Sequence, residues 1–251
     1  MEANQSTGAD EFNALRGKVV LITGGASGLG RDVAVQAAAR GAKLALLDVH
    51  INRLAEATAN VENAGAECLT IQTDVSAEED VRSAIERVVE RWGRIDVVVN
   101  SAGLYRGGLL VNTSTADYDL VFRVNVRGTF LVSREAAKVM VGQKSGHIIN
   151  IASIGAKQVF PEEIVYAASK WAVLGMSEGM SAELGPFGIR VTVVCPGGMN
   201  TTFWEENKPT RGNFNPSVLL DSARVAQAIV QIASLPPDVV VKEALVYPPG
   251  R

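Results

Sequence analysis

Short apolar segments alternate along the chain with longer segments in which apolar residues recur at helical spacing. The apolar segments cover Lys18–Thr23, Lys43–Asp48, Glu67–Gln72, Ile95–Asn100, His147–Ala152, Ile189–Val194 and Val239–Tyr247. Most are nearly continuous in apolar residues, which predicts strands that are buried on both faces of a sheet. Helices are expected between them, at about residues 29–40, 52–64, 78–92, 116–140, 166–184 and 221–234.

This alternation of strands and helices predicts an α/β fold. We expect a single doubly wound domain, in which a parallel seven-stranded sheet is flanked by helices on both faces. No linker rich in Pro, Gly or Ser divides the chain, so residues 17–251 are assigned to that domain. Residues 1–16 are predicted to form a flexible N-terminal arm, and residues at about 199–217 a lid over a site. Ser76 and Glu79 predict a capping box at the start of the helix near residue 78.

Composition and charge exclude several classes of protein. The 251 residues carry 24 Lys and Arg against 27 Asp and Glu, a formal net charge of −3, which argues against nucleic-acid binding. There is no apolar run long enough for a membrane span, and the polar, acidic first residues do not resemble a signal peptide, so a cytoplasmic location is predicted. With 2 cysteines far apart and 2 histidines, neither a disulfide framework nor a metal site is expected.

A glycine-rich turn follows the first predicted strand and precedes a helix. In this turn Gly24 permits a tight bend, Gly28 lets the backbone approach a ligand, and Gly30 lets the helix pack on the strand. Ser27 and Leu29 complete the turn. Free backbone N–H groups and the helix dipole then favour a bound diphosphate, so the turn predicts a dinucleotide site.

Asp48 ends the second predicted strand, 20 residues after Gly28. A carboxylate there can accept hydrogen bonds from the ribose hydroxyls of NAD and repel the additional phosphate of NADP. Val49 and His50 follow it, and neither is Lys or Arg. We therefore predict NAD in preference to NADP; the alternative is that Asp48 only caps the next helix.

Tyr166 and Lys170 are four residues apart on a predicted helix and therefore project from one face. A nearby ammonium lowers the pKa of a phenol, and a tuned tyrosine can exchange a proton with an alcohol or a ketone. Such a pair is usually no more than two neighbours. Ser153, however, follows the fifth predicted strand, and the carboxyl ends of parallel strands meet at the edge where ligands bind. The three side chains are therefore expected at one crevice with the glycine turn.

With these motifs the sequence resembles the short-chain dehydrogenase/reductase family, single-domain proteins of the Rossmann type. The resemblance covers about residues 18–247. It rests on the glycine turn, on the segments Asp74-Val75, Asn100-Ser101-Ala102-Gly103 and Pro196-Gly197 with Thr201, and on Asn125, Ser153, Tyr166 and Lys170 in the order of the family's tetrad. Ser101 stands where the family commonly has a second Asn.

The resemblance implies a role for each matching residue. Tyr166 would be the general acid/base, Lys170 would lower its pKa and hold the nicotinamide ribose, Ser153 would bind the substrate oxygen, and Asn125 would anchor a water. The residues implied to bind NAD are Gly24, Ser27, Gly28, Leu29, Gly30, Asp48, Asp74, Val75, Asn100, Ala102, Gly103, Tyr166, Lys170, Pro196, Gly197 and Thr201.

The leading hypothesis is an NAD(H)-dependent oxidoreductase that interconverts a secondary alcohol and a ketone. Phe160, Phe203 and Trp204 are candidates for an apolar substrate pocket. A 3-oxoacyl thioester reductase is the closest alternative, because Arg106, Lys157, Lys208 and Arg211 could hold an acidic or carrier-linked substrate at the rim.

A non-catalytic NAD-binding sensor or scaffold is the alternative from another class. The partners expected are the small-molecule substrate and further copies of the chain, as a homodimer or homotetramer. The chain end lacks the Asp-Gly-Gly tail that is common in tetrameric members, which favours contacts through helices 116–140 and 166–184.

Overall fold

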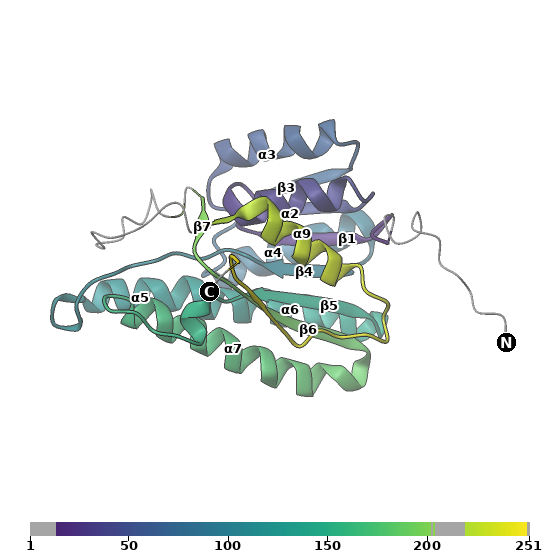
Figure 1. The fold of residues 1–251 in the computed structure, drawn as a ribbon. Helices are drawn as coiled ribbons and strands as arrows, with labels where there is room; N and C mark the ends of the chain where they lie inside the picture. The colour runs from purple at the N-terminus through teal and green to yellow at the C-terminus, as the bar shows by residue number, and fades with distance from the viewer. Residues whose placement is uncertain (1–13, 202, 204–218, 250–251) are drawn as a thin grey trace.

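One parallel sheet forms the centre of the molecule. The computed structural model describes residues 14–201, 203 and 219–249, and within them seven strands run in the order β3-β2-β1-β4-β5-β6-β9 (Figure 1). These strands are β1 (Val19–Thr23), β2 (Lys43–Asp48), β3 (Cys68–Gln72), β4 (Val97–Asn100), β5 (Gly146–Ile151), β6 (Ile189–Pro196) and β9 (Glu243–Val246). Every neighbouring pair is parallel. The predicted seven-stranded parallel sheet is confirmed.

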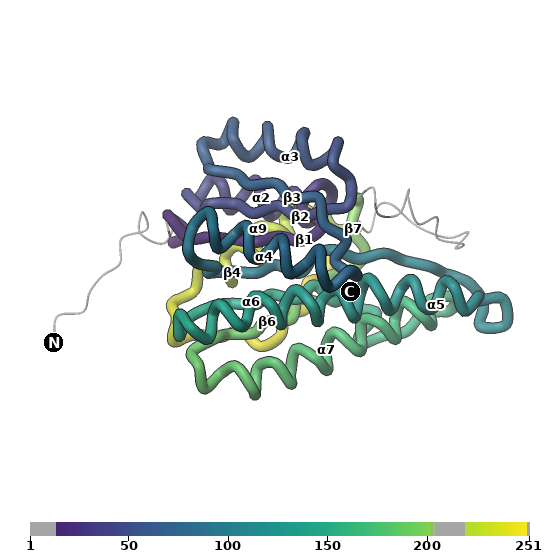
Figure 2. The backbone as a smooth tube through the Cα atoms, turned by 180° about the vertical axis from the view of Figure 1, so that it is seen from behind, coloured from purple at the N-terminus to yellow at the C-terminus, as the bar shows by residue number. Residues whose placement is uncertain are grey.

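Helices cover both faces of the sheet. One face carries α2 (Gly28–Ala38), α3 (Ile51–Asn63) and α9 (Ser222–Ala233), and the other carries α4 (Glu78–Trp92), α6 (Thr129–Gln143) and α7 (Ile164–Leu184) (Figures 1 and 2). Alternate residues of a strand point to opposite faces, so Val20 and Ile22 pack under one layer and Val19 and Leu21 under the other. Two apolar faces explain why the strands are nearly continuous in apolar residues.

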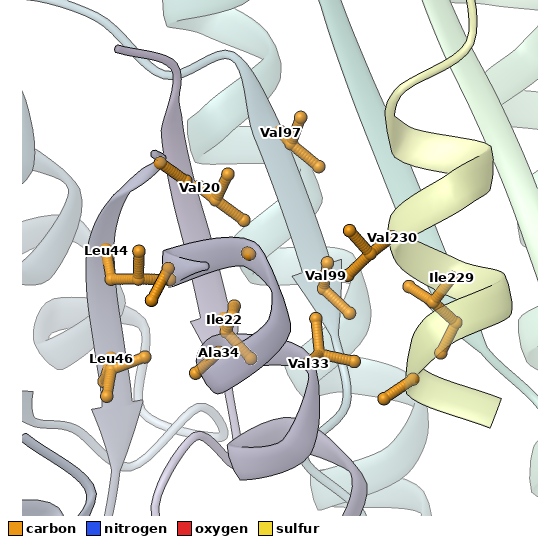
Figure 3. Packing of buried hydrophobic residues seen from close by; sticks show 14 of the residues in the cluster. Val20, Ile22, Val33, Ala34, Leu44, Leu46, Val97, Val99, Ile229 and Val230 are labelled. Atoms are coloured by element: carbon orange, nitrogen blue, oxygen red, sulfur yellow. The ribbon is translucent and has the colours of Figure 1, made fainter. Parts of the chain in front are cut away.

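The contact between α2, α9 and the sheet shows how the helices are held. Val33 and Ala34 of α2 and Ile229 and Val230 of α9 meet side chains of β1, β2 and β4 (Figure 3). Ile229 is 0% exposed, and burial of a side chain of this size contributes about 1.5–3 kcal/mol. The packing fixes the start of α2, which follows the glycine turn directly.

The long helix predicted at residues 116–140 consists of three consecutive parts. α5 (Thr115–Phe122) continues into η2 (Arg123–Gly128), a π-helical turn, and then into α6. Turns of this kind widen a helix by one residue and occur frequently at functional sites. Asn125 lies within it and is 1% exposed. Hydrophobic spacing had indicated one regular helix, so this interruption is a correction.

Two other local expectations are wrong. Ala77 is the N-cap of α4 and no side chain caps it; the N–H of Ser76 instead donates to the Asp74 carboxylate at 2.9 Å, so the capping box does not form. The last strand is restricted to Glu243–Val246. Arg190 donates to three backbone carbonyls before it, including that of Val239, which keeps the beginning of the predicted strand in the loop.

The remaining elements are short. They are η1 (Leu110–Asn112), η3 (Ile154–Ala156), η4 (Gly185–Phe187), β7 (Met199–Asn200) and β8 (Leu220–Asp221). The strands β7 and β8 pair in a second, two-stranded sheet that the hydrophobic pattern did not indicate. Together they bring both ends of the predicted lid segment to the carboxyl edge of the main sheet.

Parts of the predicted arm and lid lie outside the described residues. This holds for residues 1–13 of the arm, and for 202 and 204–218, which include Trp204, Lys208 and Arg211. Leu15, at the end of the predicted arm, is 2% exposed and belongs to the core cluster that includes residues of α2, α3 and α9. Every helix in the described part of the chain is too short or too polar to cross a lipid bilayer.

Candidate active site

A cavity of about 620 Å³ opens at the carboxyl ends of the central strands. It lies where the strand order reverses between β1 and β4, and its volume is typical of small-molecule sites. Most residues expected at the site line it: Gly24, Ser27, Gly28, Leu29, Gly30, Asp48, Asp74, Val75, Ala102, Gly103, Ser153, Phe160, Tyr166, Lys170, Pro196, Gly197, Thr201 and Phe203. Asn100 and Asn125 lie behind the cavity wall.

The glycine turn has a conformation that requires glycine at two positions. Gly24 has a φ of +65°, and a Cβ there would lie 3.0 Å from the Cα of Ala102. A Cβ on Gly30 would collide with the carbonyl oxygen of Gly24. α2 starts at Gly28 with no capping side chain and no acidic residue in its first turn. Its N–H groups are therefore available to a phosphate, and this cradle fits the diphosphate of a dinucleotide.

Asp48 is fixed by two backbone donors. Its Oδ2 accepts from the N–H of Ala26 in the glycine turn at 3.2 Å, and its Oδ1 accepts from the N–H of His50 at 3.0 Å. The carboxylate is thereby held at the cavity, in the place expected for binding a ribose. Arg53, one turn into α3, also lines this end. Arg53 is five residues after Asp48, and the two residues directly after Asp48, Val49 and His50, give no sign of this cation.

Asn100 belongs to a buried polar network beneath the cavity. Its Nδ2 donates to Ser133 Oγ of α6 at 2.9 Å and to Asn150 Oδ1 of β5 at 2.8 Å. Asn150 in turn donates to Ser177 Oγ of α7 at 2.9 Å. The network joins two central strands to two helices, so Asn100 contacts the supporting frame of the site and not the cavity itself.

Asn125 holds the loop after β4 with its side chain. Its Oδ1 accepts from the N–H of Leu104 at 2.9 Å, and its Nδ2 donates to the carbonyl of Leu104 at 2.9 Å and to Ser169 Oγ at 3.0 Å. Ser169 Oγ donates to the carbonyl of Tyr166 at 2.6 Å. The π-helical turn thus connects the cavity-lining loop to the helix that carries Tyr166. That Asn125 also anchors a water stays a prediction.

Ser153, Tyr166 and Lys170 meet at the other end of the cavity. The Ser153 hydroxyl contacts the phenol of Tyr166 by a hydrogen bond and accepts from the N–H of Gly155 at 3.0 Å. Lys170 Nζ lies 5.7 Å from the centre of the Tyr166 ring and donates to the carbonyl of Ile151 at 2.9 Å. Two hydroxyls therefore face the cavity with a buried amine behind them.

Burial dominates the proton affinities of this cluster. It raises the pKa of Tyr166 above its usual value, and the hydrogen bond from Ser153 opposes that rise. Burial lowers the pKa of Lys170 to about 8. In the protein chain by itself the net shift of the Tyr166 pKa is therefore upward, because removal from water is the largest effect, and the lowering of this pKa by Lys170 stays a prediction.

Two aromatic residues pack against Tyr166. The ring of Tyr105, which is 0% exposed, meets it edge to face with 5.2 Å between ring centres. Phe203 lies on another side, with 6.3 Å between ring centres, and lines the cavity as predicted, as does Phe160. Tyr105 was not anticipated, because nothing in its local sequence distinguishes a ring that orients another tyrosine.

The cations suggested for an acidic substrate have acidic partners where the structure describes them. Arg106 Nε lies 3.4 Å from the carboxylate of Asp117, and Lys157 Nζ lies 2.8 Å from that of Glu243. Arg106 itself lines the cavity, and the wall also contains a buried carboxylate, Glu163, that was not among the predicted site residues. It lies three residues before Tyr166, where a glutamate alone gives no signal.

Comparisons with known proteins agree with this geometry. The family model for short chain dehydrogenase matches residues 18–212. Levodione reductase of Leifsonia aquatica is 40% identical over 202 residues, covering 79% of this chain and 76% of the relative. The 3-oxoacyl-[acyl-carrier-protein] reductase of Thermotoga maritima is 35% identical over 192 residues, covering 76% and 78%. The chain belongs to the short-chain dehydrogenase/reductase family and is an oxidoreductase of that family.

Solved structures give the same result. The crystal structure of levodione reductase superimposes with a TM-score of 0.84 at 33% identity, covering 93% of this chain and 97% of the other. The alcohol dehydrogenase of the archaeon Thermococcus sibiricus, complexed with 5-hydroxy-NADP, also gives 0.84, at 28% identity and with coverage of 92% and 96%. That relative is complexed with an NADP derivative, so family membership alone does not fix the choice between NAD and NADP.

Proposed function

We propose that this protein is an NAD(H)-dependent oxidoreductase that interconverts a secondary alcohol and a ketone. The observation that carries the proposal is the meeting of the Ser153 and Tyr166 hydroxyls at one end of a cavity whose other end is the glycine turn. When bound, the nicotinamide supplies the acceptor or donor of a hydride. The glycine turn and Asp48 would hold it, because their donors and acceptor match a diphosphate and a ribose.

The chain's own groups then move the proton. The Ser153 hydroxyl binds the substrate oxygen, and Tyr166 takes the hydroxyl proton as the alcohol becomes a ketone, or returns it in the reverse direction. Lys170 is fixed by the Ile151 carbonyl, with its amine behind the phenol. Three apolar side chains in the cavity wall exclude water from the reacting carbon: Leu104, Phe160 and Phe203. The backbone of Leu104 is held by Asn125.

The experiment is absorbance at 340 nm with NAD or NADP and a panel of secondary alcohols, polyols, hydroxysteroids and 3-hydroxyacyl thioesters. Turnover of an alcohol is expected. Turnover of thioesters alone would favour the 3-oxoacyl thioester reductase, the activity named for the Thermotoga maritima relative. Tight NAD binding without turnover across the panel would instead favour a sensor.

The preference for NAD rests on Asp48. Asp48→Asn keeps the shape of the side chain but removes its charge, so the ratio of kcat/KM for NAD over that for NADP is expected to fall by about tenfold. Arg53→Ala provides the matched control at the same end of the cavity and is expected to lower turnover with NADP more than with NAD. An unchanged ratio in Asp48→Asn would show that another residue selects the cofactor.

We also propose that the protein forms a homo-oligomer through α5, α6 and α7. Tyr118 of α5, Phe130 of α6 and Trp171 of α7 are large apolar side chains that are exposed in the isolated chain. Apolar residues gathered on neighbouring helices support an interface between copies.

A further inference from the structure

A buried carboxylate in the substrate end of the cavity has no part in the chemistry described above. Glu163 immediately precedes α7, is 9% exposed and lines the cavity together with Phe160 and Tyr166. Glu163 is the N-cap residue of α7, but its side chain makes no capping hydrogen bond. Its position at the cavity is therefore not explained by helix capping.

The backbone around Glu163 is fixed. Its carbonyl accepts from the N–H of Ala167 at 2.7 Å, and its N–H donates to the carbonyl of Phe160 at 3.3 Å. The carbonyl of the preceding Glu162 accepts from the N–H of Gly108 at 2.9 Å, which attaches this segment to the loop after β4. These hydrogen bonds fix the backbone of Glu163 relative to that of Tyr166.

A carboxylate in such a place favours ligands that donate hydrogen bonds. It only accepts, and its two oxygens offer about four lone-pair positions, so it can bind a ligand donor in addition to protein donors. It repels an anionic ligand group. The negative charge of Glu163 acts on Tyr166, where it contributes to the raised pKa, which agrees with a position close to the reacting hydroxyls.

The surrounding charges strengthen this preference. Arg106, which itself lines the cavity, lies in an ion pair with Asp117, and Lys157, which does not line it, lies in an ion pair with Glu243. The cavity wall also includes Phe160, Phe203 and Ile154. A wall that combines these apolar side chains with the buried acceptor Glu163 fits a compact, largely apolar substrate that carries one further polar hydrogen.

We propose that Glu163 selects alcohols that carry a second hydrogen-bond donor, a hydroxyl or an ammonium group, close to the reacting carbinol. Vicinal diols and amino alcohols are substrates of this class, and so are hydroxyketones in the direction of reduction, where the hydroxyl beside the reacting ketone is the donor. The inference rests on the proposed alcohol–ketone oxidoreductase function of the same site and goes beyond it by naming the substrate class. Hydroxy acids are disfavoured, since their carboxylate would face that of Glu163.

The test compares matched substrates within each protein variant. The pairs are cyclohexanol with trans-1,2-cyclohexanediol, and 2-butanol with 2,3-butanediol, 3-amino-2-butanol and 3-hydroxybutanoate. The wild-type chain is expected to show a kcat/KM at least about tenfold higher for the diols and the amino alcohol than for the simple alcohols. The hydroxy acid is expected to be the poorest substrate.

Glu163→Met removes the acceptor at similar length, and the preference is expected to fall towards unity. Because the measured quantity is a ratio within one variant, a general loss of activity cancels. Glu163→Gln is the second variant, for use if Glu163→Met folds poorly, because it keeps the shape of the side chain and removes its charge. It should reduce the preference for the amino alcohol more than the preference for the diols, since binding of an ammonium group depends more on the negative charge. Glu162→Gln is the matched control, because Glu162 does not line the cavity.

An unchanged ratio in Glu163→Met, or a wild-type preference for the simple alcohols, would overturn the proposal. Failure of the wild-type chain to turn over any alcohol would instead contradict the proposed function. In that case, calorimetric titration of the same compounds into the wild-type chain and into Glu163→Met, both with NAD, tests the selectivity by binding alone. Equal affinity of the two proteins for the diols and the amino alcohol would reject the proposed role of Glu163.

Discussion

Tyr166→Phe is expected to lower kcat by about a thousandfold, whereas the dissociation constant of NAD stays within about twofold of the wild-type value. The variant loses only the hydroxyl that exchanges a proton with the substrate, and the ring keeps its contacts with Tyr105 and Phe203. Turnover is measured at 340 nm, and cofactor binding by titration of protein fluorescence.

The role of Tyr166 as general base also predicts how the rate of alcohol oxidation changes with pH. Burial raises the pKa of Tyr166, so the phenolate that accepts a proton during alcohol oxidation is scarce at neutral pH. The rate of oxidation is therefore expected to rise with pH through the alkaline range. Ketone reduction needs the protonated phenol and should not show this rise.

Tyr105→Phe is the matched control for Tyr166→Phe. Tyr105 is an equally aromatic, buried neighbour whose hydroxyl lies 3.5 Å from the carbonyl of Glu162 and does not line the cavity. It is expected to keep most of the turnover and the alkaline rise. Substantial turnover by Tyr166→Phe, or an equal loss in both variants, would contradict the assignment of Tyr166 as the general acid/base.

The sheet was predictable because its signal is local and repeated. Each central strand is a short apolar run, and a parallel sheet between two helical layers imposes that pattern on every strand. The glycine turn was predictable for a similar reason, because steric exclusion at Gly24 and Gly30 restricts the residue type. In both cases one physical requirement restricts the residue types at neighbouring positions of the sequence.

The features that were missed depend on contacts between distant segments. The π-helical turn places Asn125 against Leu104 and Ser169, and its spacing of apolar residues differs from that of a regular helix by a single position. The raised pKa of Tyr166 depends on how deeply the ring is buried, which no spacing reveals. Glu163 became a candidate only when the fold placed it in the cavity wall.

Lys170→Met is expected to abolish most turnover and at the same time to stabilise the fold. Burial lowers the pKa of Lys170 from its usual value of 10.5 to about 8, so the folded protein binds this proton more weakly than the unfolded chain does. Each tenfold loss of proton affinity corresponds to about 1.4 kcal/mol, which gives a cost of about 3 kcal/mol at pH 7. The Ile151 carbonyl loses its donor in the variant, at about 1 kcal/mol, so a net gain of about 2 kcal/mol is expected.

The stability gained by Lys170→Met is expected to depend on pH, which distinguishes it from an effect of packing. Below pH 8 the folded protein carries the buried ammonium and the full cost is present. Between about pH 8 and 10.5 the unfolded chain still binds the proton that the folded chain has released, so the stability of the wild-type protein rises with pH and the advantage of the variant shrinks. Urea denaturation of both proteins at pH 7 and pH 10 measures this change.

Lys242→Met is the control, because this lysine is exposed and its substitution should leave the free energy of unfolding within about 0.5 kcal/mol at both pH values. A Lys170→Met variant that is less stable than the wild type at pH 7 would show that the amine gains more from its surroundings than burial costs. The expected result instead identifies Lys170 as a group kept at the expense of stability. Its presence is then explained by the chemistry at Tyr166, because the cost of burying the amine exceeds the gain from its hydrogen bond to the Ile151 carbonyl.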